Sequence, residues 1–180
     1  MKNIKINLQN VNKVDQGFWT LGALFESSDF NYVKEQIIVS DHTMYTPSPA
    51  HPTDRFELTW QNDGILEELT NSLSKITNYV SDVTNINLKF GQVRVWKDLP
   101  GFMIPFHEDD QISAAHIQIY ISGPSSSIGT TWYTPSGRTT LPFTENSGYI
   151  TVCAERYPHG MLAPVRDDVR YSLYITFNKI

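Results

Sequence analysis

The chain has 180 residues, of which 40% are hydrophobic and 12% aromatic, so the composition is that of one folded domain and not of a disordered chain. Its 14 basic and 19 acidic residues give a net charge of −5, which argues against a broad nucleic-acid-binding face. The single cysteine, Cys153, excludes an intramolecular disulfide and a zinc site of the CxxC kind. No apolar run reaches the roughly 18 residues of a membrane span, and no secretory signal is visible, so we expect a cytoplasmic protein without nucleic-acid or membrane partners.

The predicted elements begin with an alternating strand at residues 2–8 and a helix from about Ser27 to Ile38. Three prolines at positions 45–52 indicate a surface loop. The clearest helix runs from Asn62 to Val83, with Asn62 or Asp63 as its N-cap, because apolar residues recur there at steps of three and four. Segments rich in β-branched and aromatic residues predict strands at 87–96, 115–122, 130–134, 148–154 and 169–178.

Many short strands, with helices only in the first half, favour a mainly β fold of the sandwich or jelly-roll kind with supporting N-terminal helices. No internal repeat or long linker divides the chain. We therefore expect a single domain that comprises residues 1–180.

His107-Glu108-Asp109 is the first candidate for a metal site. Residues i and i+2 of an extended segment point to the same side, so His107 and Asp109 can reach one ion while Glu108 points away. The pattern alone has little specificity. His159, fifty positions after Asp109, would complete a set of two imidazoles and one carboxylate, although a histidine at a strand start is commonly structural. Such a set suits non-haem Fe(II), because it leaves coordination positions open.

Arg170 and Ser172 follow His159 in the last predicted strand, where alternation places them on one face with Tyr174. We expect residues 161–168 to turn back as a hairpin that brings this strand beside the one carrying His159. The planar donors of Arg170 could then bind a carboxylate near the metal region, whereas an arginine at a strand start is by itself usually solvated.

Together these residues resemble the Fe(II)- and 2-oxoglutarate-dependent dioxygenases, in which HxD is followed by a distal His and then by a basic residue. The pattern here is His107-x-Asp109, His159 and Arg170-x-Ser172. Residues 90–96, 116–122 and 148–152 are similar to strands of the prolyl-hydroxylase-like branch, and the resemblance covers residues 86–178.

The resemblance implies a double-stranded β-helix, which is a cupin-like jelly roll, and a hydroxylase that attacks an unactivated C–H. His107, Asp109 and His159 would hold Fe(II), and Arg170, assisted by Ser172 and Tyr120, would bind the co-substrate 2-oxoglutarate, with ascorbate as the candidate reductant. Trp96 stands where relatives often have tyrosine, which removes one expected co-substrate hydrogen bond. The substrate implied is a prolyl or other amino-acid side chain, in a peptide or a small molecule, and the oligomeric state is not predicted.

Three alternatives stay open on the sequence. His116 could replace His107 as a ligand or contact substrate, although a packed histidine is more common. A zinc hydrolase would use His107, Asp109 and His159 but would leave Arg170 and Ser172 without a role. A catalytically inactive jelly-roll binding protein could instead present Trp132 and Tyr133 as an exposed stacking platform.

Overall fold

The computed structural model describes residues 3–39, 45–59, 64–109, 112–123, 128–166 and 168–180. Its helical segments are α1 (Ser27–Val39), α2 (Gly64–Leu73), the 3-10 turn η2 (Ser74–Ile76), α3 (Thr77–Thr84) and the 3-10 turn η3 (Cys153–Glu155). Its strands are β1 (Ile6–Gln9), β2 (Asn12–Asp15), β3 (Phe18–Leu21), β4 (Ala23–Phe25), β5 (Tyr45–Ser48), β6 (His51–Leu58), β7 (Leu88–Asp98), β8 (Ala115–Ser122), β9 (Ile128–Thr134), β10 (Gly137–Pro142), β11 (Gly148–Val152), β12 (His159–Gly160) and β13 (Arg170–Lys179).

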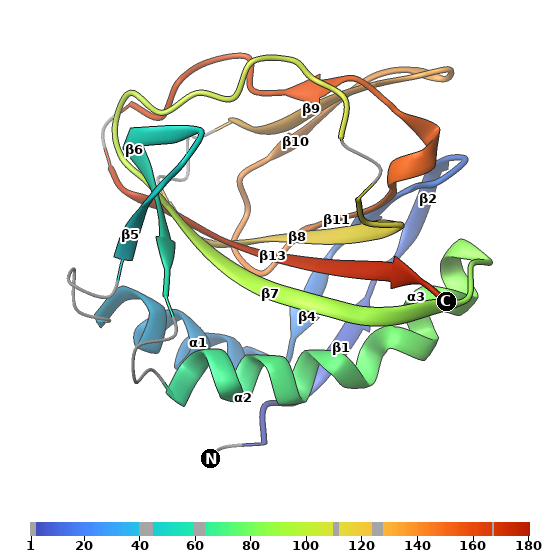
Figure 1. The fold of residues 1–180 in the computed structure, drawn as a ribbon, viewed down its shortest axis with the longest axis horizontal. Helices are drawn as coiled ribbons and strands as arrows, with labels where there is room; N and C mark the ends of the chain where they lie inside the picture. The colour runs from blue at the N-terminus through green and yellow to red at the C-terminus, as the bar shows by residue number, and fades with distance from the viewer. Residues whose placement is uncertain (1–2, 40–44, 60–63, 110–111, 124–127, 167) are drawn as a thin grey trace.

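Two antiparallel sheets face one another and form the jelly roll expected from the sequence. The larger sheet has the order β2-β3-β11-β8-β13-β7-β6-β5, and the smaller has the order β10-β9-β12. Figure 1 shows the smaller sheet above the larger one, while α1, α2 and α3 lie below it. The strands β1 and β4 form a separate two-stranded ribbon. No helix among the described segments is long and apolar enough to cross a membrane.

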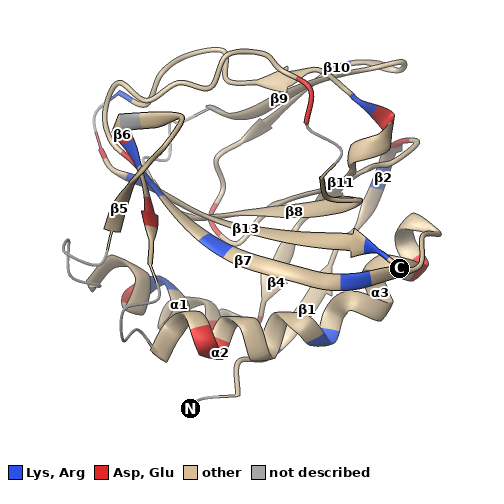
Figure 2. Ribbon diagram, viewed as in Figure 1, with Lys and Arg blue, Asp and Glu red and all other residues tan. Residues whose placement is uncertain are grey.

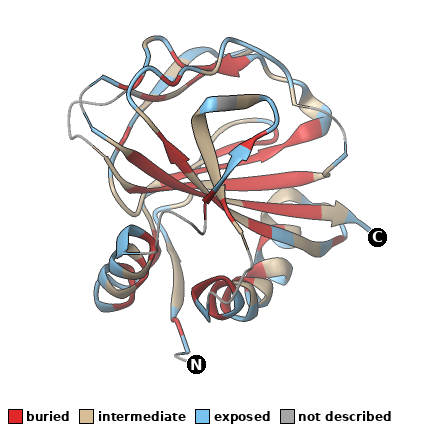
Figure 3. Ribbon diagram, turned by 60° about the vertical axis from the view of Figure 1, so that its left-hand side comes forward, coloured by how far each residue is buried: buried red, intermediate tan, exposed pale blue. Residues whose placement is uncertain are grey.

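The larger sheet has two faces of opposite character because side chains alternate along each strand. Ile117, Ile119 and Ile121 of β8 are fully buried in the main hydrophobic core together with Leu66 and Leu69 of α2. Each such buried aliphatic side chain contributes about 1.5–3 kcal/mol to folding. Figure 3 shows buried positions along the sheet and exposed positions on the outer sides of the helices. The opposite face of the sheet is left to line the space between the two sheets.

The long predicted helix exists but is broken at η2 into α2 and α3. The side-chain hydroxyl of Ser74 donates to the carbonyl of Asn71 at 3.2 Å, and that of Thr77 donates to the carbonyl of Ser74 at 2.7 Å. Such bonds to the preceding turn compete with the helical ladder, which accounts for the tighter turn. The expected N-cap residues, Asn62 and Asp63, lie outside the described residues.

Two further expectations were wrong. The proline-containing segment at 45–52 is predominantly β structure, because β5 and β6 pair as a hairpin. The predicted hairpin between the strand of His159 and the last strand does not form. β12 pairs with β9 in the smaller sheet, whereas β13 lies between β7 and β8 in the larger one. His159 and Arg170 therefore stand on opposite walls of the jelly roll.

Candidate metal centre and cavity

A short backbone bridge holds His107 and His159 side by side. The amide of His107 donates to the carbonyl of His159 at 2.9 Å, and the amide of His159 donates back at 2.8 Å. The two imidazole rings are 4.4 Å apart between centroids. Trp132 of β9 stacks on the ring of His159, with centroids 3.9 Å apart and the planes nearly parallel. Trp132 is 1% exposed, so it is part of the site wall and not the exposed platform of the binding-module alternative.

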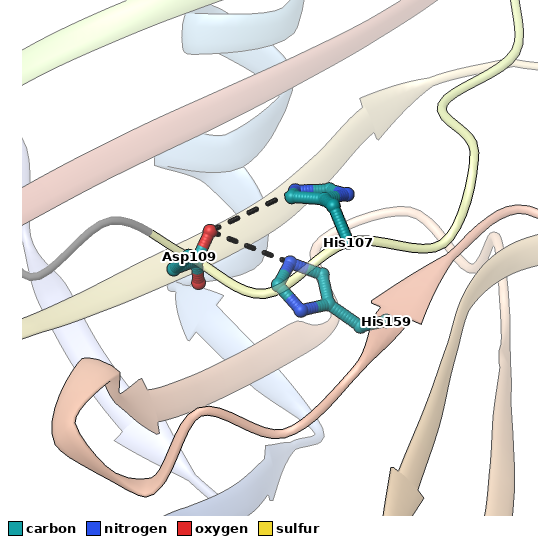
Figure 4. Close-up of side chains that lie close together, drawn as sticks. All are labelled: His107, Asp109 and His159. Carbon is teal, nitrogen blue, oxygen red and sulfur yellow. Dashed lines mark ion pairs between the residues drawn. The ribbon is translucent and has the colours of Figure 1, made fainter.

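Both imidazoles present their Nε2 atoms to one carboxylate oxygen. Asp109 Oδ1 lies 3.8 Å from His107 Nε2 and 3.5 Å from His159 Nε2. Figure 4 shows the three side chains converging, with Asp109 and His107 from one loop and His159 from β12. Their ligand atoms lie within 4.8 Å of one another. The structure thus brings together the three residues that the sequence motif singles out.

The hydrogen bonds of the two rings fit a metal site. His107 Nδ1 lies 3.0 Å from the carbonyl oxygen of Pro105, and His159 Nδ1 lies 3.0 Å from that of Tyr157. A carbonyl only accepts, so each Nδ1 carries the proton and donates. In a neutral imidazole this leaves the lone pair on Nε2, the atom that faces Asp109. The donor set is therefore oriented for a divalent ion.

Asp109 is ionised at neutral pH. Burial raises the pKa of its carboxyl, but the neighbouring imidazoles of His159, His116 and His107 outweigh that effect and lower the pKa to about 2. Its second oxygen, Oδ2, lies 3.4 Å from Nδ1 of His116. The Asp109 carboxylate thus contacts His116 as well as the other two members of the triad.

His116 lies on β8 of the larger sheet and is 1% exposed. Burial lowers the pKa of its imidazole to about 4, with the charge of Asp109 opposing this effect and those of His159 and His107 adding to it. Cys153 Sγ lies 3.7 Å from His116 Nδ1, so half-buried Asp109 and buried His116 and Cys153 form a second group of ligand type. Burial also raises the pKa of the Cys153 thiol to about 12, which keeps it protonated, as expected for a small buried residue.

Arg170 belongs to a buried cluster of charges that the sequence did not reveal. It is 5% exposed and donates to Asp98 Oδ2 from Nε at 3.2 Å and from Nη2 at 3.0 Å. Arg55 of β6 donates to both oxygens of the same carboxylate, at 2.7 and 3.1 Å. Two guanidinium groups thus share one fully buried Asp98. Arg55, Asp98 and Arg170 meet because they are cross-strand neighbours on β6, β7 and β13, a register that the sequence pattern does not give.

Tyr120 and Ser172 lie on the same face as Arg170, paired across β8 and β13. The Tyr120 hydroxyl donates to Thr130 Oγ1 at 3.1 Å and accepts from the amide of Thr130 at 2.9 Å. Burial raises its pKa, so it stays protonated. Ser172 Oγ is buried and has no hydrogen-bond partner among the described residues. An orphaned hydroxyl beside Arg170 is what a site for a polar ligand group would leave open.

A cavity of about 670 Å³ joins the triad to Arg170, and Ser172 is not among its lining residues. The triad, His116, Tyr120 and Arg170 all line it, and so do side chains of β6 and β7. A volume of this order accommodates a small-molecule ligand. The described lining outside the triad also includes Arg55, Glu57, Gln92, Arg94, Trp96, Gln118, Tyr149 and Tyr174.

No protein-family model and no curated protein sequence matches this chain. Among solved structures, a 2-oxoglutarate–Fe(II) oxygenase family protein of Burkholderia pseudomallei is 13% identical, covers 90% of this chain and 84% of its own, and has a TM-score of 0.67. A Trichoplax adhaerens prolyl hydroxylase in complex with a hypoxia inducible factor peptide is 10% identical, with 91% and 84% covered and a TM-score of 0.73. HygX of Streptomyces hygroscopicus, with nickel, 2-oxoglutarate and hygromycin B bound, is 10% identical, with 91% and 83% covered and a TM-score of 0.68.

The chain therefore has the double-stranded β-helix of the 2-oxoglutarate–Fe(II) oxygenases, the prolyl-hydroxylase-like branch included. At these identities the likeness is one of fold. It extends over nine-tenths of the chain, beyond the half on which the sequence resemblance rested.

Proposed function

We propose that this protein is a non-haem Fe(II)- and 2-oxoglutarate-dependent oxygenase, with His107, Asp109 and His159 as the iron ligands. The observation that carries the proposal is the fixed orientation of the two imidazoles, whose Nδ1 atoms are held by backbone carbonyls while both Nε2 atoms face Asp109 Oδ1. Two imidazoles and one carboxylate leave open positions on an octahedral ion. When bound, the iron supplies oxygen activation.

The charges of the cavity support 2-oxoglutarate as the co-substrate. Arg55 and Arg170 both donate to Asp98, and Arg170 lines the cavity, where a planar guanidinium is suited to bind a ligand carboxylate. Arg170 would bind the carboxylate remote from the iron, and Ser172 Oγ would donate to it. The Tyr120 hydroxyl already accepts from the amide of Thr130, and its proton, which it donates to Thr130 Oγ1 in this structure, would be donated to the same carboxylate. HygX offers a precedent, since its structure contains nickel and 2-oxoglutarate.

The reaction proposed is hydroxylation of an unactivated C–H. One oxygen atom of O₂ enters the substrate as a hydroxyl, the other enters succinate, and 2-oxoglutarate loses carbon dioxide. The protein contributes geometry and exclusion of water: Trp132 and Tyr149 are buried around the triad, and Arg170 fixes the co-substrate. The substrate we favour carries a prolyl or other amino-acid group, as the likeness to a peptide-bound prolyl hydroxylase suggests.

Anaerobic titration with Fe(II) and 2-oxoglutarate tests the proposal. We expect one iron per chain, a weak visible charge-transfer band when 2-oxoglutarate is added, and succinate formation once oxygen is admitted. His107→Ala, Asp109→Ala and His159→Ala should each abolish the band, because two remaining ligands hold a labile ion poorly. His51→Ala serves as the histidine control, because His51 lines the same cavity but belongs to neither group of ligand type; it should retain the band.

Two outcomes would overturn the proposal. Robust hydrolytic activity with zinc alone, without 2-oxoglutarate turnover, would assign the same ligands to a zinc hydrolase. Absence of both iron binding and 2-oxoglutarate binding in the folded protein would leave the inactive jelly-roll binding protein as the better description.

A further inference from the structure

A pair of opposite charges faces the cavity on the wall made by β6 and β7. Arg94 Nε lies 3.5 Å from Glu57 Oε1, and the two side chains are 38% and 29% exposed. Both line the cavity that contains the triad. Figure 2 shows acidic and basic positions close together where β6 lies beside β7. With its amide oxygen turned towards Arg94, Gln92 accepts from the same guanidinium at 2.9 and 3.1 Å.

Contacts between side chains on neighbouring strands of the larger sheet connect the Arg94–Glu57 pair to the triad. Tyr174 of β13 is the cross-strand neighbour of Arg94 and of Gln118. Its ring is 4.8 Å from that of His116, whose Nδ1 lies 3.4 Å from Asp109. Glu57 pairs across the strands with Trp96, whose ring lies 5.7 Å from the guanidinium carbon of Arg94. A ligand held by Arg94 and Glu57 would thus rest against an aromatic wall and extend towards the iron ligands.

The pair is poorly explained as a stabilising contact. Ion pairs that remain partly open to solvent contribute only about 0–1 kcal/mol, and this one is a single contact of 3.5 Å. The neighbouring cluster of Arg55, Asp98 and Arg170 differs, because its carboxylate is fully buried and bonded on both oxygens. In that cluster two guanidinium groups donate to one carboxylate, whereas Arg94 and Glu57 present one charge of each sign. A second anion alone would meet Glu57, and a cation alone would meet Arg94.

We infer that Arg94 and Glu57 bind the α-carboxylate and α-ammonium of a substrate that is a free amino or imino acid. This inference rests on the proposed function and specifies its substrate class. A zwitterion matches two adjacent opposite charges. Its binding would replace the long contact between Arg94 and Glu57 with two ion pairs, one from each side chain to the ligand. A residue inside a peptide has neither charge, so it would cover Arg94 and Glu57 and remove them from water without offering either side chain a charged partner.

Turnover by the full chain with Fe(II), 2-oxoglutarate and ascorbate tests the inference. The probes are the twenty standard amino acids, each as the free form, the N-acetyl form, the amide and the doubly capped form, and the readouts are succinate and oxygenated product by mass spectrometry. We expect at least one free amino acid to accelerate succinate formation. Capping either end should raise its KM about tenfold or more, which corresponds to about 1.4 kcal/mol.

Two substitutions test which side chain binds which end of the amino acid. Glu57→Gln should bring the free amine and the N-acetyl form to within about threefold of each other, and Arg94→Gln should do the same for the free acid and the amide. Lys34→Gln and Glu145→Gln, which break a 2.6 Å ion pair between α1 and the segment before β11, should leave every KM unchanged.

The failure of this inference is distinguishable from the failure of the proposed function. If the protein binds Fe(II) and 2-oxoglutarate but only capped peptides, or compounds lacking one of the two charges, accelerate succinate formation, the amino-acid assignment is overturned and the oxygenase stands. Unchanged discrimination in both variants would also overturn it. Absence of 2-oxoglutarate binding would overturn the proposed function and the inference with it.

Discussion

At the residue scale, two guanidinium groups around one carboxylate make Arg170 a residue that can be removed without leaving a buried charge alone. Asp98 keeps the bidentate partner Arg55 when Arg170 is truncated. Arg170→Ala should therefore fold and bind iron normally. Loss of a desolvated charge pair costs about 2–5 kcal/mol, so 2-oxoglutarate binding should weaken by roughly 30-fold or more. Isothermal titration of the iron-loaded variant measures this effect.

Arg166→Ala provides the control, because Arg166 is exposed in the segment before β13. It should bind 2-oxoglutarate as the unmodified protein does. Equal affinities for both variants would show that Arg170 does not bind the co-substrate, and an effect confined to Arg166→Ala would place the co-substrate elsewhere.

The candidate ligands could be found from sequence because they lie in a local motif plus one residue at a characteristic distance. His107, Asp109 and His159 are brought together as expected. The environment of Arg170 could not be found in this way, because Asp98 and Arg55 meet it only through the register of three strands. Alternation correctly gave the face of Arg170 and Ser172, but it says nothing of which strand lies alongside.

At the element scale, the same limit explains the error about β12. Alternation marks a strand but not its partner sheet, and two residues, His159 and Gly160, carry too little pattern to choose one. β8 and β13 were predicted nearly to their ends, because a long apolar stripe must face the helices whatever the topology. The break at η2 was missed because it depends on hydroxyl bonds within a pattern that remains helical.

The position of β12 gives a prediction about Gly160. A Cβ atom there would lie 2.9 Å from the backbone of Pro105 and Phe106, next to the bridge that joins His107 to His159. Gly160→Ala should force these backbones apart and displace the two imidazoles, so iron affinity should fall about tenfold or more. Gly64→Ala, where a Cβ meets nothing within 4 Å, is the matched control. Equal iron dissociation constants for the two variants would contradict the prediction.

The Asp15 carboxylate lies where β2 meets the turn between β9 and β10. We expect it to make the stability of the folded protein depend on pH. Its carboxylate accepts from the amides of Ser136 at 2.9 Å and Gln16 at 2.8 Å. The bond from Ser136, with those from Thr134 and Gln16, lowers its pKa from 3.8 to about 2. A carboxyl with a depressed folded-state pKa stabilises above its unfolded value, and this contribution disappears as pH falls towards 2.

Asp15→Asn should accordingly melt at a lower temperature than the unmodified protein at neutral pH, and the two melting temperatures should converge between about pH 4 and pH 2. Thermal unfolding followed by circular dichroism at several pH values measures the difference. A constant difference across this range would show that the carboxylate charge is not what the turn binds.

At the scale of the whole molecule, the triad joins two segments that backbone hydrogen bonds, such as those between His107 and His159, already hold side by side. His107 and Asp109 belong to the connection between β7 and β8 of the larger sheet, and His159 belongs to the smaller sheet. An ion held by all three links the two walls of the jelly roll in the folded state alone. Such a ligand stabilises the protein by mass action in proportion to its free concentration over its dissociation constant.

We therefore expect metal to raise the melting temperature. At a hundred times the dissociation constant the gain is about 2.7 kcal/mol, which for a chain of this size corresponds to about 5–10 °C. Anaerobic Fe(II) and, in parallel, Ni(II) should both produce the shift, and a chelator should reverse it. His159→Ala should remove the shift, whereas Cys153→Ala should keep it, because Cys153 belongs only to the inner group with His116. The reverse result would place the ion in that inner group and leave the open, cavity-facing site without a metal.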